Sequence, residues 1–217
     1  MLWWFSHALA FQVDRAPDGD PLRWPSFPVA VGWVPTEADP RVGDAGPDAL
    51  ADALAAWSTV PGAAVALGGA GEACRVPSIS PFDPNCAWVL AAWPYDDTLL
   101  ALSSTWSDSR GAILAFDIEV NGERAWSPPG YDLRAALTHE VGHGLGLEHS
   151  RLAEATMFAT IEPDDASARD LSADDRAGET FLYPADAPGG CSQAPRDGSW
   201  RAWAVLALLV ALGWRSR

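Results

Sequence analysis

Positive charge, histidine and cysteine are all scarce in this chain. Its 217 residues include 14 Lys and Arg against 29 Asp and Glu, so the formal net charge is −15 at pH 7. This excess of negative charge argues against nucleic acid and anionic membrane surfaces as partners, and it predicts a soluble, self-repelling surface. We find no internal repeat, and the length suffices for one domain with a sizeable core plus tails.

The four histidines are unevenly placed, because three of them lie within the stretch 139–150. Its first five residues fit His-Glu-x-x-His, a helical motif in which His139 and His143 lie ~40° apart on one face and about 6 Å apart along the axis. Two imidazoles so placed can share one metal ion. Glu140 lies beside them and is better placed to act on a metal-bound water than to bind the metal.

A third histidine, His149, cannot join this pair on an unbroken helix, which would carry it about 15 Å from His139 and onto another face. Gly146 removes the difficulty, because glycine tolerates the left-handed conformation that ends a helix and redirects the chain. The sequence therefore predicts a three-nitrogen site with an open fourth position, as in catalytic zinc sites. A helix with incidental histidines is the competing interpretation.

The full pattern His-Glu-x-x-His-x-x-Gly-x-x-His resembles the zinc signature of the metzincin metallopeptidases, and Ser150 after it resembles the matrixin type, the family of the matrix metalloproteinases. The resemblance implies one catalytic zinc on His139, His143 and His149, with Glu140 as the general base in peptide-bond hydrolysis. It also implies an α+β, metzincin-like fold: a twisted, mostly parallel sheet of about five strands, a long active-site helix and a C-terminal helix.

Residue patterns place these elements along a catalytic domain of residues 11–184. They predict strands at 27–34, 63–67, 86–93, 99–106 and 112–120, and helices at 47–58, from 132 onward and at 172–183. Asp132 is the expected N-cap of the histidine helix. In matrixins the strand corresponding to 99–106 is the sheet edge beside the cleft. The resemblance thus implies that the backbone of Leu102, Ser103, Ser104 and Thr105 binds substrate.

Beyond the histidines, Met157 falls where metzincins place a methionine beneath the zinc, as a packing floor; an ordinary core methionine is the alternative. Matrixins commonly continue Met-x-Pro, whereas Ala159 follows here, which leaves the S1′ preference open. The chain has no second histidine cluster, so a second, structural zinc is not expected. The acidic run 162–170 could bind calcium through its carboxylates or be solvated surface.

Cys74 and Cys86 flank a proline-rich loop and could close it as a disulfide in an oxidising compartment, or they could be two unpaired small apolar residues. The third cysteine, Cys191, lies near the C-terminus and requires a separate explanation.

Both ends of the chain suggest export. Residues 1–10 are apolar and end in an A-x-A pattern, which indicates a partial signal peptide or, alternatively, an ordinary apolar N-terminus. A linker at 185–199 precedes an apolar segment at 200–217 that ends in arginines. This tail resembles the MYXO-CTERM sorting signal of myxobacterial surface proteins. That resemblance implies cleavage near Cys191, the processing or attachment residue; a plain membrane anchor is the alternative.

The sequence as a whole predicts an exported, monomeric zinc endopeptidase that acts on proteins or peptides and is secreted or held on the outer cell surface, attached to the envelope by its C-terminal tail. The alternative is a surface-attached, zinc-containing binding or structural module without significant proteolysis. The intact Glu140 weighs against the alternative, because loss of activity usually affects the catalytic base first.

Overall fold

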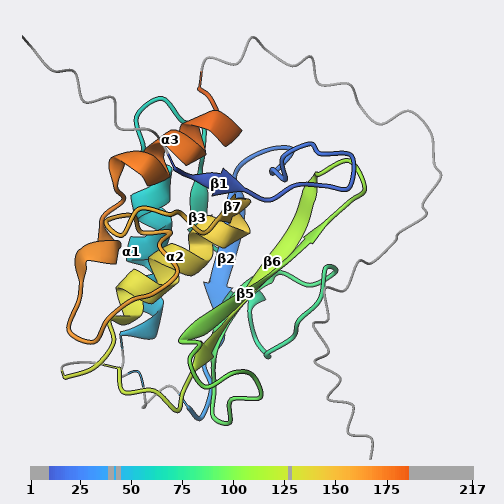
Figure 1. The fold of residues 1–217 in the computed structure, drawn as a ribbon. Coiled ribbons are helices and arrows are strands. Elements are labelled where there is room, and N and C mark those ends of the chain that lie inside the picture. The colour runs from blue at the N-terminus through green and yellow to red at the C-terminus, as the bar shows by residue number, and fades with distance from the viewer. Residues whose placement is uncertain (1–9, 39–41, 43–44, 127–128, 186–217) are drawn as a thin grey trace, which may run out of the picture.

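The fold is a twisted sheet with two helices on one face and a third helix at one end (Figure 1). We describe it from a computed structural model that covers residues 10–38, 42, 45–126 and 129–185. Its strands are β1 Gln12–Val13, β2 Val29–Trp33, β3 Leu67–Gly69, β4 Asn85–Leu90, β5 Ala101–Ser107, β6 Ile113–Asn121 and β7 Leu147–Glu148. Its helices are α1 Gly46–Ser58, α2 Leu133–Gly144 and α3 Ala173–Leu182, with short 3-10 turns η2 Gly71–Ala73 and η3 Ser167–Arg169.

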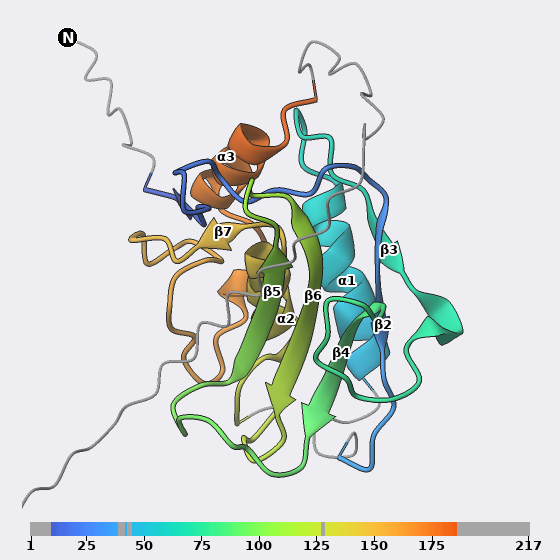
Figure 2. The ribbon, with the colours of Figure 1, turned by 90° about the vertical axis from the view of Figure 1, so that its right-hand side faces the viewer.

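The main sheet has five strands in the order β3-β2-β4-β6-β5 (Figure 2). All neighbours are parallel except β5, which runs antiparallel to β6 and forms one edge. The predicted α+β fold with a mostly parallel five-stranded sheet is therefore confirmed. The antiparallel edge strand is the element that the cleft needs, because the outer backbone groups of an edge strand can pair with another chain.

Helices α1 and α2 pack against each other on the inner face of this sheet. Leu50, Leu54 and Trp57 give α1 its buried face, as their i, i+4, i+7 spacing predicts. The Trp57 indole Nε1 donates a hydrogen bond to the Thr138 carbonyl at 2.8 Å, which ties α1 to the turn of α2 that precedes the histidines. The position of α2 is thus fixed by packing and by a directed contact.

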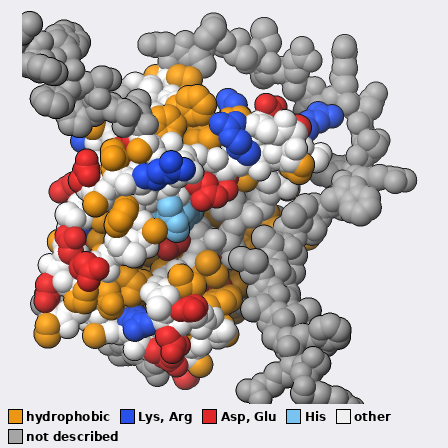
Figure 3. Space-filling model, viewed as in Figure 1, with side chains coloured by type: hydrophobic (Ala, Val, Ile, Leu, Met, Phe, Trp, Pro, Cys, Tyr) orange, Lys and Arg blue, Asp and Glu red, His pale blue; other side chains and the backbone are white. Residues whose placement is uncertain are grey.

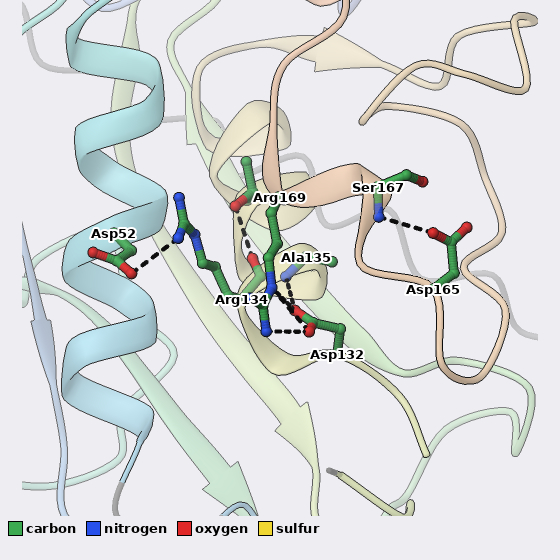
Figure 4. A network of polar contacts seen from close by, with 8 residues as sticks. Asp52, Asp132, Arg134, Ala135, Asp165, Ser167 and Arg169 are labelled. Carbon is green, nitrogen blue, oxygen red and sulfur yellow. Dashed lines mark hydrogen bonds and ion pairs between the residues drawn. The ribbon is translucent and has the colours of Figure 1, made fainter. Parts of the chain in front are cut away.

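The first turn of α2 is held by polar contacts (Figure 4). The Asp132 carboxylate accepts the Ala135 N–H at 2.8 Å, so Asp132 is the N-cap. The same carboxylate forms an ion pair with Arg169, and Arg134 pairs with Asp52 of α1 at 3.2 Å. The cap and the Arg169 pair together link the start of α2 to η3.

Two sequence-based assignments differ from the structure. The strand predicted at 63–67 is wrong, because β3 begins only at Leu67, where the register with Val29 of β2 starts, and continues through Gly68 and Gly69. The two-stranded sheet of β1 and β7 was not predicted. The other strands and helices lie where their patterns place them, apart from shifts of their ends.

The predicted partial signal peptide at 1–10 and the C-terminal linker, Cys191 and apolar tail at 185–217 lie almost entirely outside the described residues. Within the part of the chain that the structure describes, no helix is long and apolar enough to cross a membrane.

Candidate zinc site and cleft

The three histidines of the motif converge at one end of α2. His139 and His143 lie one turn apart on this helix, which ends at Gly144. Gly146 then adopts a φ of +92°, and a Cβ at this position would lie 2.5 Å from the Leu22 carbonyl oxygen. Only glycine fits this turn, which leads into β7 and brings His149 back toward the helix. Figure 3 shows histidine at the surface of this face, next to acidic side chains.

The histidine nitrogens are arranged as metal ligands. The Nε2 atom of His143 lies 3.1 Å from that of His139 and 3.3 Å from that of His149, and the candidate ligand atoms all lie within 4.8 Å of one another. Two nitrogens on one tetrahedral zinc at ~2.0–2.1 Å are about 3.3 Å apart. Among the described residues, this is the one group of three or more His, Cys, Asp or Glu residues so arranged.

Backbone carbonyls orient two of the rings. The Nδ1 atoms of His139 and His143 donate to the carbonyls of Thr156 and Leu147, both at 2.8 Å. Since a carbonyl only accepts, each Nδ1 carries the proton and each Nε2 keeps its lone pair for a metal. Burial also lowers the pKa of His139 to about 3 and that of His143 to about 4. Both imidazoles are therefore neutral at pH 7, as zinc requires, and the donor set fits this metal.

Glu140 is buried beside this group. Burial raises the pKa of its carboxyl to about 8, and a hydrogen bond from the Ser103 backbone N–H opposes the shift. The double charge of a zinc ion nearby would also oppose the shift and lower this pKa. Glu140 thus has the environment of a proton acceptor whose basicity depends on the metal, and it touches the edge strand through Ser103.

Met157 packs under the histidine helix. A Cβ on Gly142 would lie 2.2 Å from the Met157 Sδ, so this glycine makes room for the methionine next to His143. The N–H groups of Thr156 and Met157 donate to the buried Asp175 carboxylate at 2.8 and 3.0 Å. Because the Thr156 carbonyl orients His139, Asp175 in α3 indirectly holds a ring of the site.

Asp174, the neighbouring residue in α3, makes a second set of links. Its carboxylate accepts the Ser150 hydroxyl at 2.6 Å and the backbone N–H groups of Ala10 and Phe11 at 2.6 and 3.0 Å. Ser172 caps the helix in a capping box with Asp175. The last helix therefore ties together the N-terminal strand, the residue after His149 and the segment around Met157.

A cleft of about 840 Å³ opens over the three histidines. One wall is β5, including the four residues with predicted substrate contacts, and the segment 158–162 also lines it. Asp14, Glu140, Glu148 and Glu162 are its acidic lining residues, and no Lys or Arg of the described chain lines it. The long, open shape and free strand edge suit an extended polypeptide, and the charge disfavours an acidic one.

The Asp14 and Glu148 carboxyls also line this cleft, and no sequence pattern indicated them. The two share a hydrogen bond, and burial together with Glu148 raises the pKa of Asp14 to about 8. They meet because β1 pairs with β7 in a two-residue register that no periodic pattern could reveal.

The other candidate residues can also be located. Cys74 and Cys86 are joined by a disulfide, which closes the proline-rich loop. In the acidic run 162–170, the Asp165 carboxylate accepts the Ser167 N–H at 2.8 Å, and the described residues form no carboxylate cluster there that could hold a cation. Calcium binding therefore stays a prediction without a ligand set.

Comparison with known proteins agrees with this site. Residues 78–184 match the family model described as matrixin. Metalloendoproteinase 4-MMP of Arabidopsis thaliana is 33% identical over 93 residues, which are 42% of this chain and 27% of that protein. Human matrix metalloproteinase-26 is 34% identical over 91 residues, or 42% of this chain and 35% of the relative. Stromelysin-3 of Xenopus laevis is 38% identical over 104 residues, which are 41% of this chain and 21% of the relative.

The chain thus spans about a third or less of the length of these relatives. The matched segment contains the three histidines, Glu140, Met157 and all of α3. Together with the fold, these similarities support a zinc metallopeptidase like the matrix metalloproteinases.

Proposed function

We propose that this protein is a zinc-dependent endopeptidase of the matrixin type that hydrolyses peptide bonds within proteins. One observation carries the proposal: three imidazoles converge at the floor of an open cleft, with a buried carboxylate beside them and the edge strand of the sheet along one wall. Zinc, protein chain and general base would each have a place in this arrangement.

His139, His143 and His149 would hold the zinc, which supplies Lewis acidity that polarises a peptide carbonyl and makes water a stronger acid. Glu140 accepts a proton from the attacking water and returns it to the departing amine. Burial keeps this proton transfer out of bulk solvent, and the Ser103 N–H stabilises the carboxylate between the two transfers.

The substrate would bind as an added strand along β5. Leu102, Ser103, Ser104 and Thr105 lie on the edge strand and line the cleft, so their outer backbone groups are the proposed partners of the peptide. Since such hydrogen bonds recognise backbone, the side chains of the cleft would set the sequence preference. Met157 and Gly146 would act as structural supports of the metal site.

We further propose that the protein is exported, acts as a monomer and is attached to the cell envelope through the C-terminal segment that contains Cys191. The Cys74–Cys86 disulfide supports an oxidising compartment. A surface module that holds zinc without proteolysis is not favoured, because Glu140 and the open cleft next to it are both in place.

The test compares the full chain with Glu140→Ala in cleavage of casein and of a quenched peptide library, with zinc content measured for both. We expect the substitution to lower turnover by about 10²–10⁴-fold while one zinc per chain remains. Glu123→Ala, which removes an exposed glutamate two residues after the end of β6, is the matched control and should leave both quantities unchanged. Equal cleavage by the wild type and Glu140→Ala would contradict the proposed base, and a wild type without zinc would contradict the metal site.

A further inference from the structure

Exposed apolar side chains gather on two loops next to the cleft. Ile79 and Phe82 belong to the loop that the disulfide closes, and their side chains are 44% and 89% exposed. Tyr95 and Leu99 belong to the loop between β4 and β5 and are 37% and 39% exposed. We call these four residues the outer apolar surface. Large exposed apolar groups that gather in one place commonly mark a binding surface.

The two loops lie side by side on the outer face of the sheet, opposite the helices. Asp117 and Glu119 are two residues apart in β6, so their side chains leave the same face ~7 Å apart. The Asp117 carboxylate accepts the Ser80 N–H at 3.2 Å, and the Glu119 carboxylate accepts the Tyr95 hydroxyl at 2.8 Å. Neighbouring residues of one strand therefore anchor both loops.

Several further contacts hold the loops in one conformation. The disulfide closes the first loop, and Asp117 also accepts the Cys86 N–H at 2.8 Å. In the second loop the Trp93 and Tyr95 rings pack edge to face with centroids 5.0 Å apart. A surface that is already ordered loses little conformational freedom when it binds, so its apolar contacts contribute more of their energy to affinity.

The outer apolar surface is continuous with the cleft, since Ile79, Tyr95 and Leu99 also line it. In a peptide paired with β5, alternate side chains point to the two faces of the sheet. One set would point toward α2 and the histidines. The other set would point toward the loops. Phe82, three residues after Ile79 in the same loop, does not line the cleft and would contact substrate residues beyond it.

We propose that the outer apolar surface is a second recognition surface, which binds apolar side chains of a protein substrate while the scissile bond lies over the histidines. The proposal rests on the proposed function. Its ligand is an unfolded or extended apolar stretch of polypeptide. The Asp83 and Asp96 carboxylates on the two loops accept hydrogen bonds from Ser78 and Thr98. Together with the net charge of −15 of the whole chain, they disfavour an anionic membrane as the ligand.

The experiment measures kcat and KM of the full chain and its Phe82→Ala variant on casein and on short quenched peptides that cannot reach position 82. We expect KM for casein to rise about three- to tenfold, with kcat on casein and peptide cleavage unchanged. Phe82→Leu should restore most of the casein KM. Leu114→Ala, which removes an exposed apolar side chain of β6 outside the cleft lining, is the control and should change the kinetics on neither substrate.

Unchanged casein kinetics in Phe82→Ala would overturn the proposal, as would an equal loss on peptides and casein. If the wild type cleaves nothing, the proposed function fails, and binding of casein to the wild type and to Phe82→Ala then decides this surface separately. Weaker binding by the variant would support the surface, and equal binding would overturn it. Phe82-dependent association with phosphatidylcholine vesicles, without an effect on casein, would assign the surface to a membrane and overturn the proposal.

Discussion

The two faces of the main sheet are built from different chemistry. On the inner face, Phe116 and Ile118 of β6 pack beneath the helices in the main core. On the outer face, Asp117 and Glu119 of the same strand are equally buried but accept hydrogen bonds from loops. Close packing fixes the helix that carries His139 and His143, whereas buried acceptors select particular loop donors. The catalytic geometry and the surrounding surface thus depend on different interactions, which mutations can separate.

The largest expected effect on activity comes from Gly146, in the turn that follows the histidine helix α2. Gly146→Ala places a Cβ 2.5 Å from the Leu22 carbonyl oxygen at a φ of +92°, so the turn must move and His149 with it. We expect loss of zinc and of nearly all peptidase activity, measured by metal analysis and peptide cleavage. Gly68→Ala is the matched control, because an added Cβ there meets nothing within 4 Å. Full zinc content in Gly146→Ala would show that the turn does not position His149.

On the outer face, Asp117→Ala should lower stability while sparing the metal. Removal of the carboxylate leaves the Ser80 and Cys86 N–H groups without their acceptor, which costs about 2–3 kcal/mol. Denaturant unfolding measures the loss, and zinc content should stay at the wild-type level. The exposed Asp97→Ala serves as control and should change stability by less than about 0.5 kcal/mol. Zinc loss in Asp117→Ala would mean that the two faces are coupled.

A smaller, pH-dependent effect is expected from Glu179 of α3. Its side chain is fully buried, neither carboxylate oxygen has a hydrogen-bond partner in the described structure, and burial raises its pKa from 4.5 to about 8. Since the folded state binds the proton more tightly, the contribution of Glu179 to stability is greatest below pH 4.5 and is lost as the pH rises to about 8.

Glu179→Leu removes this titration, so unfolding measured at pH 5, 6, 7 and 8 should show a flatter profile than that of the wild type. The variant should be about 2 kcal/mol more stable than the wild type at pH 8. Parallel profiles for the two proteins would show that Glu179 ionises without cost. Glu179→Gln keeps a polar side chain that cannot ionise, so a flat pH profile in this variant too would assign the pH dependence to the charge of Glu179.

Sequence patterns predicted the helix side of the molecule well. The cap at Asp132 and the glycine at 146 each express a local rule, and the structure follows both. The convergence of the histidines could be inferred for the same reason, because helix geometry and one turn determine it.

Elements defined by distant partners could not be predicted in this way. The Gly68 and Gly69 pair in β3 has no strand propensity and is a strand only because β2 lies beside it. Asp14 enters the cleft because β1 meets β7 across more than a hundred residues of sequence. The lack of a hydrogen-bond partner for Glu179 among the described residues is likewise a property of packing, which no spacing of residues reveals.

The two aspartates of α3 imply an order of assembly. Asp174 and Asp175 hold Ala10, Ser150, Thr156 and Met157, which come from separate parts of the chain. The histidine geometry is therefore complete only when the last helix has docked, after the rest of the domain has been synthesised. We expect zinc affinity to appear late and cooperatively in folding, so that metal capture reports the completed domain.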